Sequence, residues 1–212
     1  LEGIAKKYNY KVVEIGNIIN KEIIEFSKKD KNNKNFQKLN ILVLGGSQTA
    51  KIFAETLPKI FQKCSQRGFA LRIYQHCLPS QNNDLKLFYE KTNIEFESFN
   101  FSNNLLEYFS KIDLAITRSG SSVLAELTNA KIPFISVPLP SSADNHQLKN
   151  AIFYQKKDLS FLVEEKDLNS SLINHIQKIY ENKSVLNNII KNQSQYSDKN
   201  VYENINIVLK EI

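Results

Sequence analysis

The stretch Ile112-Asp-Leu-Ala-Ile-Thr-Arg-Ser-Gly-Ser-Ser-Val-Leu-Ala-Glu126 decides the fold of this chain. Residues 112–117 are mostly apolar and predict a buried strand of a parallel sheet. Residues 118–121 predict a turn, and a helical pattern then runs to about Ala130. Small residues at such a turn let a ligand approach the backbone and leave the first helical N–H groups free.

A carboxylate, Glu126, follows Gly120 one to two helical turns along the chain. This layout suits a nucleotide, with a phosphate near the turn and the ribose hydroxyls on the acid. Taken alone, the pattern fits equally well a helix start capped by Ser119, with Glu126 on the solvated face.

Outward from this stretch, apolar runs alternate with helical patterns. This alternation predicts an α/β fold, a Rossmann-like parallel sheet flanked by helices, with a helical C-terminal tail. Predicted strands cover 10–15, 40–44, 69–74, 94–96, 114–117, 132–138 and 159–163. Predicted helices cover 20–28, 50–67, 82–92, 105–109, 120–130, 144–156, 168–181, 183–192 and 200–212, and residues 28–38 predict a solvated loop.

Three turns lie at the carboxyl ends of predicted strands, at 45–48, 118–121 and 138–144. In parallel sheets ligands bind at these ends, where the strand order reverses. We therefore expect the three turns to converge on one crevice.

The turn Gly45-Gly46-Ser47-Gln48 suits a diphosphate, because two glycines permit close backbone approach and Ser47 adds a hydroxyl. It is neither a GxGxxG motif nor a P-loop. A tight turn with Ser47 as the helix N-cap explains it about as well.

The third turn leads into Asp144-Asn-His-Gln147, four hydrogen-bonding side chains that are suited to sugar hydroxyls. The alternative is simple N-capping by Asp144, with His146 and Gln147 in solvent. No nucleophile spacing supports a catalytic role for His146. The pair Gln75-His76, at another strand end, is interpreted as supporting the site rather than contacting the ligand.

Composition excludes several classes of function. The net charge of +6 and pI of about 9.1 are compatible with phosphorylated ligands or an anionic membrane surface. Because the lysines are scattered and no basic stripe carries interleaved aromatics, nucleic acid is not expected as a partner. The two cysteines, Cys64 and Cys77, have no zinc spacing, so no metal site is predicted. The absence of a signal peptide and of a long apolar run favours the cytoplasm. A chain of 212 residues that starts at Leu1 and contains no Met is expected to be a piece of a longer protein.

The motifs together resemble the MurG family of peptidoglycan N-acetylglucosaminyltransferases, and the resemblance spans essentially the whole chain. Three motifs carry it in the family's order and spacing, Ile41–Gln48, Arg118–Glu126 and Asp144–Ala151. Gly16-Asn-Ile-Ile19 is similar to the segment that joins this family's two domains, and Phe101–Leu105 resembles another family segment.

The resemblance implies the C-terminal, donor-binding half of a two-domain GT-B glycosyltransferase. Residues 1–20 are then an interdomain connector, 21–198 a UDP-GlcNAc-binding domain, and 199–212 a helix that packs toward the missing N-terminal domain. The implied reaction transfers N-acetylglucosamine from UDP-GlcNAc to the lipid-linked muramoyl-pentapeptide, with inversion and without a metal or cofactor. The implied location is the cytoplasm, peripheral on the inner face of the cell membrane.

The resemblance also assigns site residues. Gly46 and Ser47 lie at a donor phosphate, and the backbone N–H groups of Ser121 and Ser122 face the diphosphate. No general base is visible, and the resemblance places it in the missing domain.

The remaining assignments concern the nucleoside and the sugar. The Ser102 backbone contacts uracil, Glu126 accepts from the ribose hydroxyls, and His146 and Gln147 reach the GlcNAc hydroxyls.

The chain departs from the family pattern at Thr49, Asn20 and His146, where the family has Gly, Arg and Gln. A different class of function stays open, a non-catalytic or split module that binds a nucleotide sugar but lacks an acceptor domain.

Overall fold

A computed structural model describes residues 13, 15–28, 37–46, 50–100, 105–196, 198 and 200–210. Its centre is a six-stranded parallel sheet with the order β3-β2-β1-β4-β5-β6. The predicted fold class is therefore confirmed. The strands are β1 (Leu39–Leu44), β2 (Leu71–His76), β3 (Glu95–Phe99), β4 (Leu114–Thr117), β5 (Phe134–Ser136) and β6 (Phe161–Leu162).

The strand order reverses between β1 and β4, which lie side by side. Ile41 pairs with Leu114 and Leu44 pairs with Thr117. From β1 the chain crosses over to β2 and β3 on one side, and from β4 to β5 and β6 on the other. A crevice opens at such a reversal because the connections leave in opposite directions.

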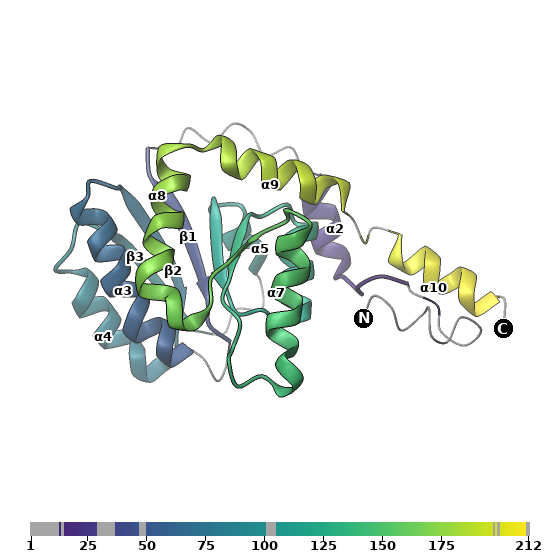
Figure 1. Cartoon of the computed structure of the whole chain (residues 1–212), viewed down its shortest axis with the longest axis horizontal. Helices are drawn as coiled ribbons and strands as arrows, with labels where there is room; N and C mark the ends of the chain where they lie inside the picture. The colour runs from purple at the N-terminus through teal and green to yellow at the C-terminus, as the bar shows by residue number, and fades with distance from the viewer. Residues whose placement is uncertain are drawn as a thin grey trace.

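Helices cover both faces of the sheet (Figure 1). Alternate residues of β1 explain why, since Ile41 and Val43 belong to one apolar core and Leu42 and Leu44 to the other. The first core is closed mainly by α3 (Ala50–Gln66), α4 (Pro79–Tyr89) and α8 (Ile173–Glu181). The second is closed by α2 (Lys21–Lys28), α5 (Leu105–Phe109), α6 (Ser121–Asn129) and α7 (His146–Lys156).

Two helices complete the chain. α9 (Ser184–Gln195) packs against α6 and α8. α10 (Val201–Lys210) stands away from the sheet, beside the described N-terminal segment (Figure 1). Its Ile207 and Leu209 side chains are exposed, and so is Ile18 in that segment.

Several element boundaries differ from those predicted. The helix predicted over 82–92 begins at Pro79, because proline favours the first helical position and Gln81 Oε1 accepts the Leu78 N–H at 2.9 Å. The helix predicted over 168–181 begins with a π-helical turn, Leu168–Leu172. The strand predicted over 10–15 and most of the loop over 28–38 lie outside the described residues, and Val13 and Ile15 are not in a strand.

Among the helices that the structure describes, none has the length and apolar character needed to cross a membrane.

Candidate functional site

A cavity of about 810 Å³ lies at the carboxyl ends of the strands, at the point where their order reverses. All three predicted turns contribute to it, through Gly46, Gly120 and Leu139, so their convergence is confirmed. The full lining is Leu44, Gly45, Gly46, His76, Cys77, Leu78, Pro79, Phe99, Asn100, Leu105, Thr117, Arg118, Gly120, Val123, Leu139 and Gln147.

The N-terminus of α6 opens at this cavity without a side-chain cap. The N-cap is Gly120 in extended conformation, and no side chain in the described part of the chain caps the first helical N–H groups. The alternative of a Ser119 cap is therefore wrong. A Cβ at Gly120 would meet only Val123, at an ordinary 3.8 Å. No described neighbour excludes a side chain at Gly120, and the missing side chain keeps the helix N-terminus accessible from the cavity.

The glycine turn after β1 also contributes to the wall of the cavity. Gly46 has φ +68°, a conformation that glycine adopts without strain. Ser47, which is predicted to bind phosphate, lies outside the described residues, as do Thr49 and Ser102. The described part of the turn therefore brings Gly45 and Gly46 to the cavity wall.

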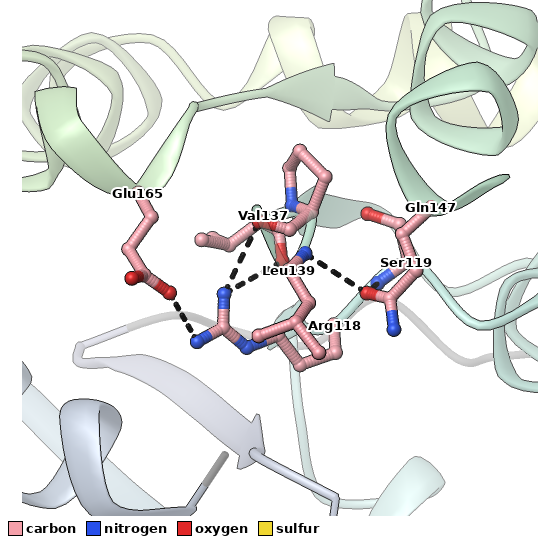
Figure 2. Close-up of polar contacts among 7 residues, drawn as sticks. Arg118, Ser119, Val137, Leu139, Gln147 and Glu165 are labelled. Atoms are coloured by element: carbon pink, nitrogen blue, oxygen red, sulfur yellow. Dashed lines mark hydrogen bonds and ion pairs between the residues drawn. The ribbon is translucent and has the colours of Figure 1, made fainter. Parts of the chain in front are cut away.

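Gln147 joins two of the three turns. Its Oε1 accepts hydrogen bonds from the N–H of Ser119 at 3.1 Å and of Leu139 at 3.0 Å (Figure 2). Asn150 adds a bond from Nδ2 to the Ser119 carbonyl, at 3.0 Å. The N–H of Ser119 is thus occupied by Gln147 and is not available to a ligand. Gln147 Nε2 bonds no described residue.

Arg118 is a buried cation in the cavity wall (Figure 2). Its guanidinium donates to the carbonyls of Val137 at 3.3 Å and Pro138 at 3.2 Å, and forms an ion pair with Glu165. The ring of Phe53 lies 4.7 Å from the guanidinium carbon. Burial lowers the pKa of Arg118, and Glu165 opposes that effect. Arg118 therefore anchors the carboxyl end of β5 beneath the cavity.

Glu126 lies on α6 beyond Val123, half-buried, and does not line the cavity as the free protein presents it. It forms no hydrogen bond or ion pair with a described residue. Burial raises the pKa of its carboxyl group. A half-buried carboxylate without a partner has acceptor capacity available for a ligand.

The raised pKa of Glu126 has a consequence for stability. The folded chain keeps this proton at pH values where the unfolded chain has released it, so stability falls as the pH rises through that window. We expect the Glu126→Gln variant to lack this component. The stability of the unaltered chain relative to the variant should decline as the pH rises above about 4, where the carboxyl group of the unfolded chain titrates. The decline should be under about 1 kcal/mol, because solvent screens a half-exposed group. Thermal unfolding at several pH values measures it, and a constant difference would contradict the burial effect.

The remaining predicted residues lie around the rim. Ser121 and Ser122 are exposed in the first turn of α6, next to Gly120. His146 is exposed, and its Nδ1 lies 2.8 Å from the Ala143 carbonyl oxygen. Asp144 is not the cap of α7, since the N-cap position is Asn145, in left-handed conformation.

Reasoning from the sequence missed the wall formed by β2 and β3. His76 and Phe99 line the cavity with their rings 5.8 Å apart, and burial lowers the pKa of His76. The neighbouring Gln75 is fully buried, and neither of its amide atoms has a hydrogen-bond partner among the residues that the structure describes. His76 therefore contributes to the cavity directly, whereas the sequence suggested a supporting role. Its position at a strand end was the available signal.

No group of three or more His, Cys, Asp or Glu side chains suited to a metal ion occurs among the described residues. Cys64 and Cys77 are buried free thiols.

Residues 40–205 match the family described as glycosyltransferase family 28 C-terminal domain. Two curated relatives are each called UDP-N-acetylglucosamine–N-acetylmuramyl-(pentapeptide) pyrophosphoryl-undecaprenol N-acetylglucosamine transferase. The protein from Pelagibacter ubique is 34% identical over 95% of this chain and 56% of its own length. The one from Rickettsia bellii is 32% identical over 86% of this chain and 52% of its own length. The chain thus spans about half the length of the curated relatives it matches.

Among solved structures, the crystal structure of Acinetobacter baumannii MurG superposes with a TM-score of 0.73 at 22% identity. The superposition covers 90% of this chain and 53% of that one. At this identity the likeness concerns the fold.

Proposed function

The chain belongs to the glycosyltransferase family 28 C-terminal domains, and from that premise we propose that it is the donor-binding half of an inverting, metal-independent glycosyltransferase. The proposed donor is UDP-GlcNAc. The proposed acceptor is the lipid-linked muramoyl-pentapeptide, held by a second half that matches the remaining length of the relatives.

One observation carries the proposal, the uncapped N-terminus of α6 at a cavity on the strand reversal. The free N–H groups at the start of a helix, together with its dipole, favour a diphosphate. The volume of about 810 Å³ is within the usual range for a ligand of this size.

The proposed contacts follow from this placement. The diphosphate lies between Gly46 and the N–H groups of Ser121 and Ser122, with the Ser47 hydroxyl on a phosphate. The ribose hydroxyls reach Glu126, whose carboxylate has no partner among the described residues.

The uracil base and the GlcNAc sugar of the donor lie on either side of the diphosphate. Uracil meets the backbone at Ser102. The GlcNAc hydroxyls reach His146 and the free Nε2 of Gln147, whose Oε1 is held by two N–H groups.

In the proposed reaction the 4-hydroxyl oxygen of the acceptor attacks the anomeric carbon. The bond from that carbon to the phosphate oxygen breaks, and UDP leaves with the electron pair. The hydroxyl proton passes to a base in the second half. Negative charge grows on the diphosphate, and N–H donors at a helix start stabilise it.

We also propose the arrangement of the whole enzyme. Residues 1–20 connect the two halves, 21–198 form the donor domain, and 199–212 pack toward the second half. The exposed Ile18, Ile207 and Leu209 support this division. The proposed location is the inner face of the cell membrane, held peripherally.

The decisive test is binding of UDP-GlcNAc by calorimetry, with Glu126→Ala as the variant. Loss of the carboxylate should weaken binding by about 1–3 kcal/mol, or about 5- to 150-fold in Kd, since the ribose hydroxyls lose their acceptor. Glu203→Ala, an exposed change on α10, is the matched control and should leave Kd unchanged. Equal Kd values for the Glu126→Ala variant and the unaltered chain would remove Glu126 from the site.

A second candidate is a non-catalytic module that binds a nucleotide sugar, since every contact proposed above for this chain serves the donor. Turnover with and without the N-terminal half of the Pelagibacter relative separates the two. Binding without turnover in either mixture favours the module, and absence of UDP binding overturns both.

A further inference from the structure

A buried carboxylate ties the two ends of the described chain to the helix that opens the cavity. Asp198 is 8% exposed and has no ion pair with a described residue. Its Oδ1 accepts the N–H of Asn17 at 3.0 Å, and its Oδ2 accepts Asn17 Nδ2 at 3.2 Å and Asn129 Nδ2 at 3.0 Å. The N–H of Asp198 returns a bond to Asn129 Oδ1, at 3.0 Å. We name Asn17, Asp198 and Asn129 the clasp.

The backbone of Gly16 lies so close to this carboxylate that no side chain fits between them. Its φ is +95°, and a Cβ there would lie 2.7 Å from Asp198 Oδ1. Any side chain at this position would therefore strain the backbone and push the carboxylate out of the clasp. The Gly16-Asn17 pair supplies the space and the two donors that Asp198 needs.

The same two chain segments also meet further along. The Tyr202 hydroxyl donates to the Ile19 carbonyl at 2.7 Å, and Asn204 Nδ2 donates to the Ile15 carbonyl at 3.3 Å. These bonds join residues 15–20 to α10 but do not touch α6. The clasp is thus a hydrogen-bonded connection that runs from both segments into α6.

α6 links the clasp to the cavity. Asn129 is its last residue, and Asn129 Nδ2 also donates to the Ala125 carbonyl within the helix, at 2.9 Å. The nine residues of α6 span about 13 Å, with Gly120 and the cavity at the other end. When a ligand orders the first turn of a helix of this length, the last turn becomes ordered as well, because the hydrogen bonds of a helix form cooperatively.

We propose that Asp198 is a positioning residue, which makes residues 15–20 and the start of α10 move as one unit with the donor-binding helix α6. This inference rests on the proposed function, since it assumes that the donor binds at the start of α6. Its consequence is that a filled donor site fixes the two chain segments that run toward the second half.

Hydrogen exchange measured by mass spectrometry tests the coupling, with UDP as the probe on the whole chain. In the unaltered protein UDP should slow exchange in α6, in residues 15–20 and in 200–204. In Asp198→Asn an amide NH₂ faces the donors of Asn17 and Asn129. Protection of α6 by UDP should remain, while UDP-dependent protection of 15–20 and 200–204 should be lost.

Two further variants complete the design. Asn17→Ala removes the bond from Nδ2 to Asp198 Oδ2, keeps the backbone N–H bond to Oδ1 and leaves Asp198 bonded to Asn129. It should therefore weaken UDP-dependent protection of 15–20 alone. It decides the question even where Asp198→Asn does not fold. Tyr202→Phe removes a bond between the same two segments that bypasses α6, and it should keep all the protection.

The outcomes separate the two proposals. Slowed exchange in α6 but not in 15–20 of the unaltered chain overturns the coupling and leaves the proposed function intact. Undiminished UDP-dependent protection of 15–20 in Asn17→Ala also overturns the coupling. If UDP slows exchange nowhere, the proposed function fails, and the inference resting on it is overturned as well.

Discussion

Replacement of Arg118 by alanine is expected to lower the free energy of unfolding by about 3 kcal/mol, the lower end for breaking a buried ion pair from one side. The variant leaves the Glu165 carboxylate, whose side chain is only 26% exposed, without its cation. It also removes the donor to the carbonyls of Val137 and Pro138. The loss in free energy of unfolding stays at the lower end of the range for buried ion pairs, because Glu165 retains some contact with water.

Urea denaturation measures this loss, and an unchanged m-value shows that the unfolding transition itself is the same. Arg118→Lys should recover part of the stability, since one ammonium cannot serve two carbonyls and a carboxylate as a planar fork does. Arg67→Ala is the matched control, because Arg67 is exposed and its side chain bonds only Gln177 among described residues. That change should stay within about 0.5 kcal/mol.

A double-mutant cycle assigns the loss. In a Glu165→Ala background, Arg118→Ala should cost clearly less than in the unaltered chain, because no carboxylate is left uncompensated. Equal costs in the two backgrounds would show that the ion pair contributes nothing and that packing on Phe53 dominates.

The sheet could be predicted from the sequence because its strands are runs of apolar residues buried on both faces. Residues 40–44 and 114–117 show this most clearly, and the structure has strands at 39–44 and 114–117. The strand order does not follow from such runs, since it depends on which helix packs on which face.

The individual contacts of the site could not be predicted in the same way. Gln147 bonds backbone groups 28 and 8 positions away, and spacing in the sequence gives no sign of either bond. The burial of Arg118 is equally hidden, because its partner Glu165 lies 47 residues further along. Position at a strand end predicted that these residues approach one cavity, but not which atoms remain free for a ligand.

Gln147 has two functions that two substitutions separate. Gln147→Ala removes the acceptor of the Ser119 and Leu139 N–H groups, and Ser119 is fully buried. Two unsatisfied donors should lower the free energy of unfolding by about 2–4 kcal/mol. Gln147→Glu keeps an acceptor oxygen in place, so its stability should stay within about 1 kcal/mol of the unaltered chain, since a carboxylate is at least as strong an acceptor as an amide.

UDP-GlcNAc affinity should behave differently. Gln147→Glu replaces the Nε2 donor, which is proposed to reach a GlcNAc hydroxyl, by an anionic oxygen on the wall of the cavity that also holds the proposed diphosphate. Two like charges ~8 Å apart repel by about 2 kcal/mol at an effective dielectric constant of ~20, which corresponds to a loss of about 30-fold in affinity. The same exchange at the exposed Gln155, further along α7, is the matched control and should change neither quantity. Unchanged affinity in Gln147→Glu would confine Gln147 to holding the loops, and a loss of stability equal to that of Gln147→Ala would contradict the bridge between Ser119 and Leu139.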